Sequence, residues 1–178
     1  STGLCWGYGI SGELGSGSTT QRNSPYPINT SVLFTSIGRG QTGTPAACGI
    51  ATNGTAYCWG YNTNGQLGNG LLAQSNIPVA VQATGSFANI TIGSAGGCGT
   101  LTNGTFLCWG RTDYSGNGIP AAVPYPVPVL TKGTFSVGSG YSLAGASSVS
   151  SASTCGVLAN GTGLCWGIDM NGRLGAGS

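Results

Sequence analysis

The sequence has very little charge and no histidine. Charged residues account for 4% of its 178 residues, against about a quarter in ordinary globular proteins, and the net charge is +2. The few cations are scattered, so we expect neither nucleic-acid binding nor attachment to an anionic membrane. No histidine is present to activate a serine or cysteine nucleophile, and the only carboxylates, Glu13, Asp113 and Asp169, occupy unrelated positions. We therefore expect no enzymatic activity.

Long apolar runs are also missing. The most apolar stretch, residues 119–130, contains four prolines and cannot form a transmembrane helix. The glycines that follow each Cys-Trp-Gly motif belong to turns between strands, so no phosphate-binding loop is predicted. No Cys-x-x-Cys pair with zinc-site spacing occurs either. We therefore expect no membrane insertion, no metal site and no cofactor.

What the sequence does contain is a tandem repeat, most clearly in residues 48–70, CGIATNGTAYCWGYNTNGQLGNG. The first half of this segment returns twice downstream, and the second half returns near both ends of the chain. Residues 1–4 are predicted to end a preceding hairpin, and residues 165–178 to form a partial repeat. Between them we predict three blade-length repeats, the last with a serine-rich insertion: residues 5–57, 58–107 and 108–164.

An Asn-Gly pair at the centre of each repeat predicts a β-hairpin. A two-residue loop would place Cys48 opposite Trp59, whereas a three-residue loop at 52–54 places Cys48 opposite Cys58. The second register allows a disulfide, because directly opposite residues lie about 4.5–5.5 Å apart at Cα. The same spacing recurs twice, and we predict three disulfides: Cys48–Cys58, Cys98–Cys108 and Cys155–Cys165.

The seven cysteines also bear on the cellular compartment. Disulfides persist in secreted proteins and are rare in the cytosol, so we predict a secreted or extracellular protein, with the cell surface as one such location. The alternative is a core of free thiols. Cys5 is the odd cysteine, and its alignment with Cys165 makes it the second cysteine of a hairpin whose first strand would precede Ser1.

Each repeat offers four candidate strands: a proline-flanked run, a phenylalanine-led run and the two arms of the hairpin. Proline lacks an N–H group, which confines the first run to the edge of a sheet. Repeats of about fifty residues with four short strands are typical of β-propeller blades rather than helical solenoids. We therefore predict an all-β fold of β-propeller blades with four antiparallel strands each.

The segment CWGYNTNGQLGNG follows a hairpin ending in NGTAYC and precedes a Pro-Val strand and a Phe-led strand. In this arrangement the chain resembles the regulator of chromosome condensation repeat family over nearly its whole length. The resemblance implies a β-propeller, typically with seven blades. Because about three full blades with partial ends cannot close such a ring, we expect either part of a larger propeller or blades contributed by several chains, including a filament.

A tryptophan follows the second cysteine of each hairpin. A repeated indole can serve as a stacking platform for a sugar or a base, but at a fixed repeat position it more often fills the space between blades. We predict this structural role for Trp6, Trp59, Trp109 and Trp166. The leucines of the G-x-L-G turns are predicted to anchor their loops: Leu14, Leu67 and Leu174.

Five asparagines stand in an acceptor sequence for N-glycosylation: Asn29, Asn53, Asn89, Asn103 and Asn160. The Asn-Gly-Thr sequence at each hairpin tip also has a purely structural explanation, because Asn-Gly forms the turn and Thr suits the following strand. A secretory route and a surface with little charge nevertheless favour glycans at Asn53, Asn103 and Asn160, one per blade along one rim.

Two classes of function remain. The first is a secreted, glycosylated structural or surface-assembly protein that associates with itself or with other copies of the repeat. The alternative is an extracellular binding propeller that recognises a protein or a glycan through the loops of one face. The family resemblance would also allow guanine-nucleotide exchange on a small GTPase, but the disulfides and the lack of an acidic or basic face argue against it.

Overall fold

The computed structural model describes residues 3–40, 45–93, 96–111, 122–129, 143–145 and 152–167, and the regular elements in these ranges are all β-strands. None of these residues belongs to a helix long and apolar enough to cross a membrane. In chain order the strands are β1 (Leu4–Gly7), β2 (Arg22–Pro27), β3 (Phe34–Arg39), β4 (Ala46–Ala51), β5 (Ala56–Gly60), β6 (Ser75–Ala80), β7 (Phe87–Ile92), β8 (Gly96–Leu101), β9 (Phe106–Gly110), β10 (Val123–Pro128), β11 (Leu143–Gly145), β12 (Ala152–Val157) and β13 (Gly163–Gly167).

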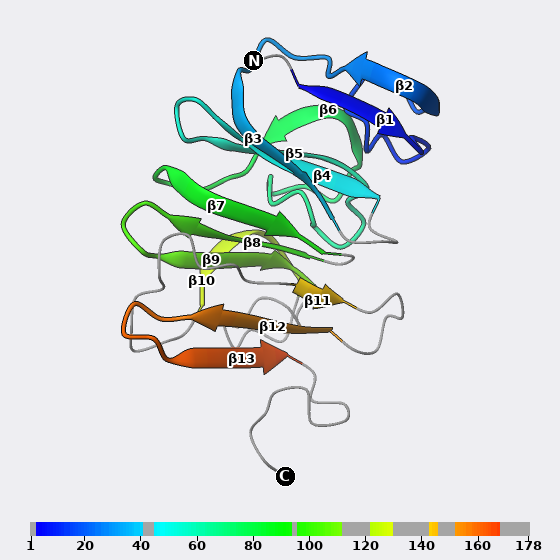
Figure 1. Cartoon of the computed structure of the whole chain (residues 1–178). Helices are drawn as coiled ribbons and strands as arrows, with labels where there is room; N and C mark the ends of the chain where they lie inside the picture. Colours follow the sequence, from blue (N-terminus) through cyan, green and yellow to red (C-terminus); the bar gives the residue numbers. More distant parts are fainter. Residues whose placement is uncertain are drawn as a thin grey trace.

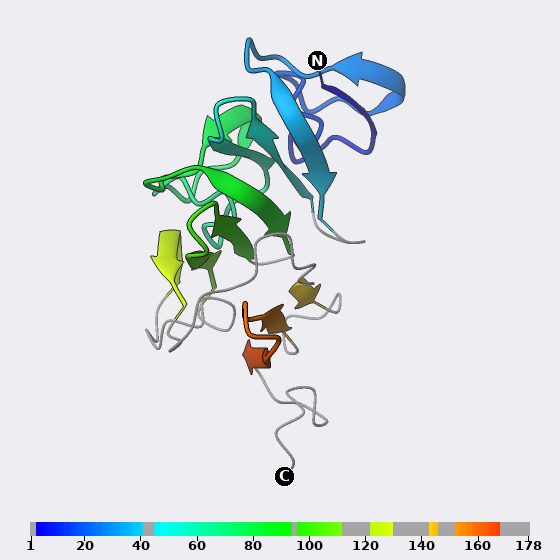
Figure 2. The same ribbon diagram turned by 60° about the vertical axis from the view of Figure 1, so that its left-hand side comes forward.

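These strands form antiparallel sheets that follow one another as stacked blades (Figures 1 and 2). Two sheets have four strands in chain order, β3-β4-β5-β6 and β7-β8-β9-β10. On either side of them lie the pair β1-β2 and the three strands β11-β12-β13. The prediction of an all-β fold built from four-stranded antiparallel blades is confirmed.

The four-stranded sheets begin and end at different residues from the sequence repeats, whose bounds were counted from the cysteines. The first four-stranded sheet begins at Phe34 and ends at Ala80, so it passes from one sequence repeat into the next at Cys58. The second four-stranded sheet likewise runs from Phe87 to Pro128. The reason is that the two arms of the hairpin are the central strands of a sheet, which places the sequence motif at the middle of a blade.

The central hairpins have three-residue loops. Ala51 N donates to Thr55 O at 2.8 Å, which closes a loop of residues 52–54, and Cys48 lies opposite Cys58 in the register of β4 and β5. Gly54 has a φ of +83°, a conformation that residues with a side chain seldom adopt. This is the register that permits cross-strand disulfides.

The proline-containing strands β2, β6 and β10 lie at the edges of their sheets. Directly after β10, Val129 N donates to Phe106 O at 3.0 Å, so an N–H group on the preceding residue would point away from the sheet. That preceding residue is Pro128. Directly after β2, Ile28 N donates to Gly3 O at 3.0 Å, and the residue before it is Pro27. Proline therefore replaces residues whose N–H groups would have no partner in the sheet.

The hydrophobic core lies between neighbouring sheets. In the larger cluster, Leu67 and the Cys48–Cys58 disulfide from one blade pack with Phe87 and Trp109 from the next. A second cluster joins the β1-β2 pair to the first complete blade: Ile28, Phe34, Ala47 and Trp59. Each blade therefore buries its faces against its neighbours, as in other repeat proteins.

Candidate functional site

The three Asn-Gly-Thr turns lie along one rim, which we call the tip rim (residues 52–55, 102–105 and 159–162). Each turn joins the two strands of a hairpin, and all three project from the same side of the molecule (Figure 1). In each turn the asparagine Oδ1 accepts a hydrogen bond from the threonine N, at 3.0, 3.0 and 3.1 Å. All three asparagines are exposed: Asn53, Asn103 and Asn160. The turn occupies the amide oxygen and leaves Nδ2, the atom that would carry a glycan, outside this hydrogen bond.

The first two turns of the tip rim are joined by the segment that begins β7. Phe87 N donates to Gly54 O at 2.8 Å, and Thr102 N donates to Ser86 O at 2.9 Å. A Cβ on Gly54 would lie 2.5 Å from the Cβ of Ser86. The main-chain hydrogen bonds therefore fix the spacing between Asn53 and its counterpart on the next blade, and the space beside Gly54 has no room for a side chain.

An open groove of about 710 Å³ lies beside the middle turn of the tip rim, and we call it the Tyr125 groove. Asn103 and Thr105 form part of its wall, Tyr125 and Pro126 of β10 form another part, and Gln82 follows β6. The Tyr125 side chain is 47% exposed. The groove thus combines an aromatic ring and proline with amide and hydroxyl groups, next to an acceptor asparagine.

The two other acceptor asparagines lie outside the tip rim. Asn89 is half-buried in β7, opposite Thr100 of β8. Asn29 is exposed, but its side chain lies against Gly17, where an added Cβ would be 2.6 Å from the asparagine Nδ2. Neither position has the turn geometry of the tip rim.

Two disulfides occupy equivalent positions in neighbouring sheets: Cys48–Cys58 and Cys98–Cys108. Their Cα atoms are 4.0 and 4.1 Å apart, and none of the four side chains is more than 1% exposed. In the third hairpin, Cys165 is disulfide-bonded and lies opposite Cys155 in the strand register. Cys5 is half-buried beside the cluster around Trp59 and takes part in neither of the first two disulfides.

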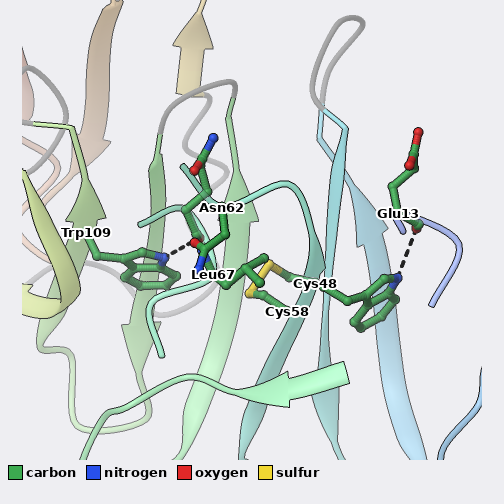
Figure 3. The surroundings of a disulfide bond; sticks show 8 residues. Glu13, Cys48, Cys58, Asn62, Leu67 and Trp109 are labelled. Atoms are coloured by element: carbon green, nitrogen blue, oxygen red, sulfur yellow. Dashed lines mark hydrogen bonds between the residues drawn. A yellow bond between two sulfur atoms is a disulfide. The ribbon is translucent and has the colours of Figure 1, made fainter. Parts of the chain in front are cut away.

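Trp59 and Trp109 are fully buried between blades, and each is held by the preceding repeat. Trp59 Nε1 donates to the backbone oxygen of Glu13 at 3.0 Å, and Trp109 Nε1 donates to that of Gln66 at 2.7 Å. Glu13 and Gln66 are the second residues of two successive G-x-L-G turns. Figure 3 shows both contacts, on either side of a disulfide. The same contact between a tryptophan and the G-x-L-G turn of the preceding repeat, which we call a joint, therefore occurs twice in the chain.

The last glycine of each G-x-L-G turn is part of this joint. Gly15 and Gly68 have φ angles of +65° and +64°. A Cβ would lie 2.9 Å from Trp59 Nε1 at the first position and 2.8 Å from Trp109 Nε1 at the second. The preceding leucines, Leu14 and Leu67, are buried. Only glycine both adopts this backbone conformation and leaves room for the indole.

Buried polar side chains that sequence reasoning missed shape these turns. The Glu13 Oε2 accepts from Ser11 N at 2.8 Å, and Gln66 Oε1 accepts from Asn64 N at 2.9 Å. Their matching place in two G-x-L-G turns was the signal available in the sequence. Asn62 donates to the backbone oxygens of residues 71 and 73, both at 2.9 Å, and accepts from Leu67 N at 2.8 Å. Glycine occupies the equivalent place in the first repeat, so no periodic signal marked Asn62.

The remaining predicted positions differ from this pattern or cannot be placed. Trp6 is 58% exposed, because the described residues put no G-x-L-G turn against it. Trp166 is half-buried and meets Phe106 of the previous blade edge to face, with ring centroids 5.7 Å apart. Leu174, both aspartates and most of the serine-rich insertion lie outside the described residues.

The loops at the other end of the central strands expose apolar side chains. We call this surface the loop face (residues 8–20 and 61–74). Its exposed apolar side chains are Tyr8, Ile10, Leu71 and Leu72. The chain direction places residues 61–74 opposite the tip rim, because the turn at 52–55 begins β5 and residues 61–74 follow the other end of that strand.

Comparison with known proteins agrees with this architecture. Residues 53–100 match the family model of the regulator of chromosome condensation (RCC1) repeat. Human WBSCR16 has a TM-score of 0.77 and 19% identity over 98% of this chain and 45% of its own. A chain in the structure of Kap60 bound to yeast RCC1 (Prp20) has a TM-score of 0.71 and 18% identity over 93% of this chain and 39% of its own.

A third similar structure is the entire ectodomain of the receptor kinase CR4 from Physcomitrella patens. It has a TM-score of 0.52 and 25% identity over 85% of this chain and 33% of its own. The chain thus spans less than half the length of each of these structures. Residues 53–100 therefore match one repeat of the regulator of chromosome condensation family, and the chain folds as β-propeller blades like those of the yeast RCC1 structure.

Proposed function

We propose that the chain belongs to an extracellular, glycosylated propeller that serves as a non-catalytic assembly scaffold. The observation that carries the proposal is the pair of equivalent disulfides, Cys48–Cys58 and Cys98–Cys108, buried at the centres of successive blades. Disulfides of this kind form in oxidising compartments and are rare in the cytosol. Their repetition favours a fold adapted to the secretory route over an isolated pairing of two cysteines.

Glycans on the tip rim fit the low charge of the surface. A protein with only 4% charged residues needs other groups to keep its surface hydrated, and N-linked sugars supply many hydroxyl groups. Asn53, Asn103 and Asn160 are exposed, and their turns leave each Nδ2 out of the hydrogen bond that closes the turn. One glycan per blade would hydrate the tip rim and leave the loop face for contacts with other molecules.

Expression through a eukaryotic secretory pathway tests the compartment and the glycans together. Intact mass should fall on enzymatic glycan release, and the Asn-to-Asp conversion left by release should map to the tip rim. In denaturant, where buried thiols become accessible, the cysteines of both disulfides should resist alkylation until the protein is reduced. A secreted protein whose mass does not change, or whose Cys48 and Cys58 are alkylated before reduction, would contradict the proposal.

Sedimentation over a range of concentrations, followed by electron microscopy, tests the scaffold function. Extended assemblies are expected if the propeller is a structural component. A monodisperse monomer at every concentration would overturn this function.

An extracellular binding propeller is the second candidate, and the loop face favours it. Tyr8, Ile10, Leu71 and Leu72 are each more than half exposed, on loops held in place by the buried joints around Trp59 and Trp109. The similar CR4 structure is an ectodomain, and the similar yeast RCC1 was solved with a bound protein, Kap60. The replacement of Leu71 and Leu72 by serine should leave stability unchanged, because both are exposed, and should weaken any protein contact made through this face.

A further inference from the structure

We propose that the Tyr125 groove binds the chain's own glycan, namely the first N-acetylhexosamine units attached to Asn103. The inference rests on the proposed function, because it requires Asn103 to be glycosylated. It goes further in assigning a binding surface to that glycan. The groove runs directly from the acceptor site, since Asn103 and Thr105 of the acceptor sequence are themselves part of its wall.

The attachment chemistry fits the turn. A glycan is transferred when Nδ2 of asparagine forms a bond to the anomeric carbon of a polyprenyl-pyrophosphate-linked oligosaccharide. The bond from that carbon to the pyrophosphate breaks, the pyrophosphate leaves with the electron pair, and the transferase takes a proton from Nδ2. Thr105 N holds Asn103 Oδ1 at 3.0 Å after folding, so the oxygen is fixed and the sugar extends from Nδ2. Asn103 therefore offers a short, turn-anchored connection into the groove.

The composition of the groove suits a pyranose ring. One face of such a ring presents C–H groups and packs on aromatic or proline surface, while its hydroxyl and acetamido groups need hydrogen-bonding partners. Tyr125, Pro126 and Leu107 provide the apolar surface, and Gln82 and Thr84 provide polar groups. A volume of about 710 Å³ also lies within the range of ~300–1,000 Å³ that is typical of small-molecule sites.

Asn53 offers an internal comparison, because its turn is the same but its surroundings are not. Val79 lies opposite Cys58, and Val127 lies opposite Cys108, so Ile77 in β6 is the structural equivalent of Tyr125 in β10. The wall of the Tyr125 groove includes Asn103 and not Asn53. A glycan on Asn53 would therefore have the same attachment without the aromatic ring.

Enzymatic release of glycans from the folded, secreted chain tests the proposal, with the sites resolved by mass spectrometry. The glycan on Asn103 should be released roughly fivefold more slowly than the glycan on Asn53, as expected for the loss of an aromatic contact of ordinary strength. Tyr125→Ala should bring the rate at Asn103 up to the rate at Asn53. Ile77→Ala is the matched control and should change neither rate.

A second measurement does not depend on a truncated side chain. In the unaltered protein, proton NMR should show contacts between a sugar acetyl methyl group and the Tyr125 ring. If Asn103 carries no glycan in a chain that is glycosylated elsewhere, glycosylation at this site fails and the groove proposal falls with it. If Asn103 is glycosylated but its glycan is released as fast as that on Asn53 and shows no contact with Tyr125, only the groove proposal is overturned.

Discussion

Replacement of Gly68 by alanine should break the joint between two blades. Gly68 has a φ of +64°, and an added Cβ would lie 2.8 Å from Nε1 of Trp109. Trp109 is fully buried, and its indole donates to the backbone oxygen of Gln66 at 2.7 Å. The added Cβ would meet the ring itself, which cannot rotate aside in a packed core as the end of a flexible side chain could. The indole must therefore shift away from Gln66.

The expected loss of stability has two parts. A left-handed backbone conformation costs an alanine about 1–2 kcal/mol. Displacement of the indole leaves a buried N–H group without its acceptor, which costs about 1–3 kcal/mol more. Gly68→Ala should therefore lower the free energy of unfolding by roughly 2–5 kcal/mol.

Gly161→Ala separates the two parts. Gly161 has a φ of +85°, but no atom lies within 4 Å of its added Cβ, so this variant should lose only the conformational part. Gly15→Ala is a replicate at the other joint, because its φ is +65° and its Cβ would lie 2.9 Å from Trp59 Nε1. We expect Gly15→Ala and Gly68→Ala to behave alike and both to lose more stability than Gly161→Ala.

Two measurements check this expectation in oxidised protein. Urea unfolding followed by tryptophan fluorescence gives the free energies, and NMR gives the hydrogen exchange of the indole N–H of Trp109. The exchange measurement is needed because repeat arrays can unfold locally rather than in one step. If Gly68→Ala and Gly161→Ala lose equal stability, and the Trp109 indole remains equally protected in both, the proposed contact between Gly68 and the indole does not contribute to stability.

Three further changes probe single blades. The double variant Cys48→Ala, Cys58→Ala should lower the free energy of unfolding in urea by about 2–3 kcal/mol, since the disulfide closes a short loop of sequence separation 10. A variant as stable as the oxidised parent protein would contradict this. Asn62→Ala should cost about 2–3 kcal/mol by the same assay, because its side chain makes three hydrogen bonds to the backbone of its own loop. Glu13→Gln should raise the free energy of unfolding by about 1 kcal/mol, since the buried Oε1 of Glu13 has no donor among the described residues. Glutamine already fills the equivalent place at Gln66. A lower midpoint of thermal denaturation in this variant would show that the carboxylate is needed.

The parts of the fold that the sequence predicted are governed by contacts close in sequence. Cys48 and Cys58 are ten residues apart, and the glycine in the loop between them allows only certain registers. The position of β10 at a sheet edge followed from chemistry within the strand itself, because Pro128 has no N–H group to donate. Neither prediction required knowledge of how one blade lies on the next.

The joints between blades could not be predicted in the same way. The acceptor of the Trp59 indole is 46 residues earlier in the chain, and that of Trp109 is 43 residues earlier. The repeat indicates that neighbouring blades touch, but it does not specify which backbone oxygen receives an indole N–H. The Tyr125 groove was also missed, because it combines side chains of β8, β9 and β10 with the segment that follows β6. Its walls become neighbours only after two blades have packed.

The tryptophans show how much of a blade's core comes from the preceding repeat. Trp6 and Trp59 occupy the same Cys-Trp-Gly motif, yet Trp6 is 58% exposed and Trp59 is fully buried. The difference is the G-x-L-G turn that covers Trp59, with Glu13 as acceptor and Gly15 against the ring edge. The motif therefore does not bury its own indole. Stability in this array arises at the joints between repeats, where nearest-neighbour contacts dominate, and a substitution at a joint should weaken two blades at once.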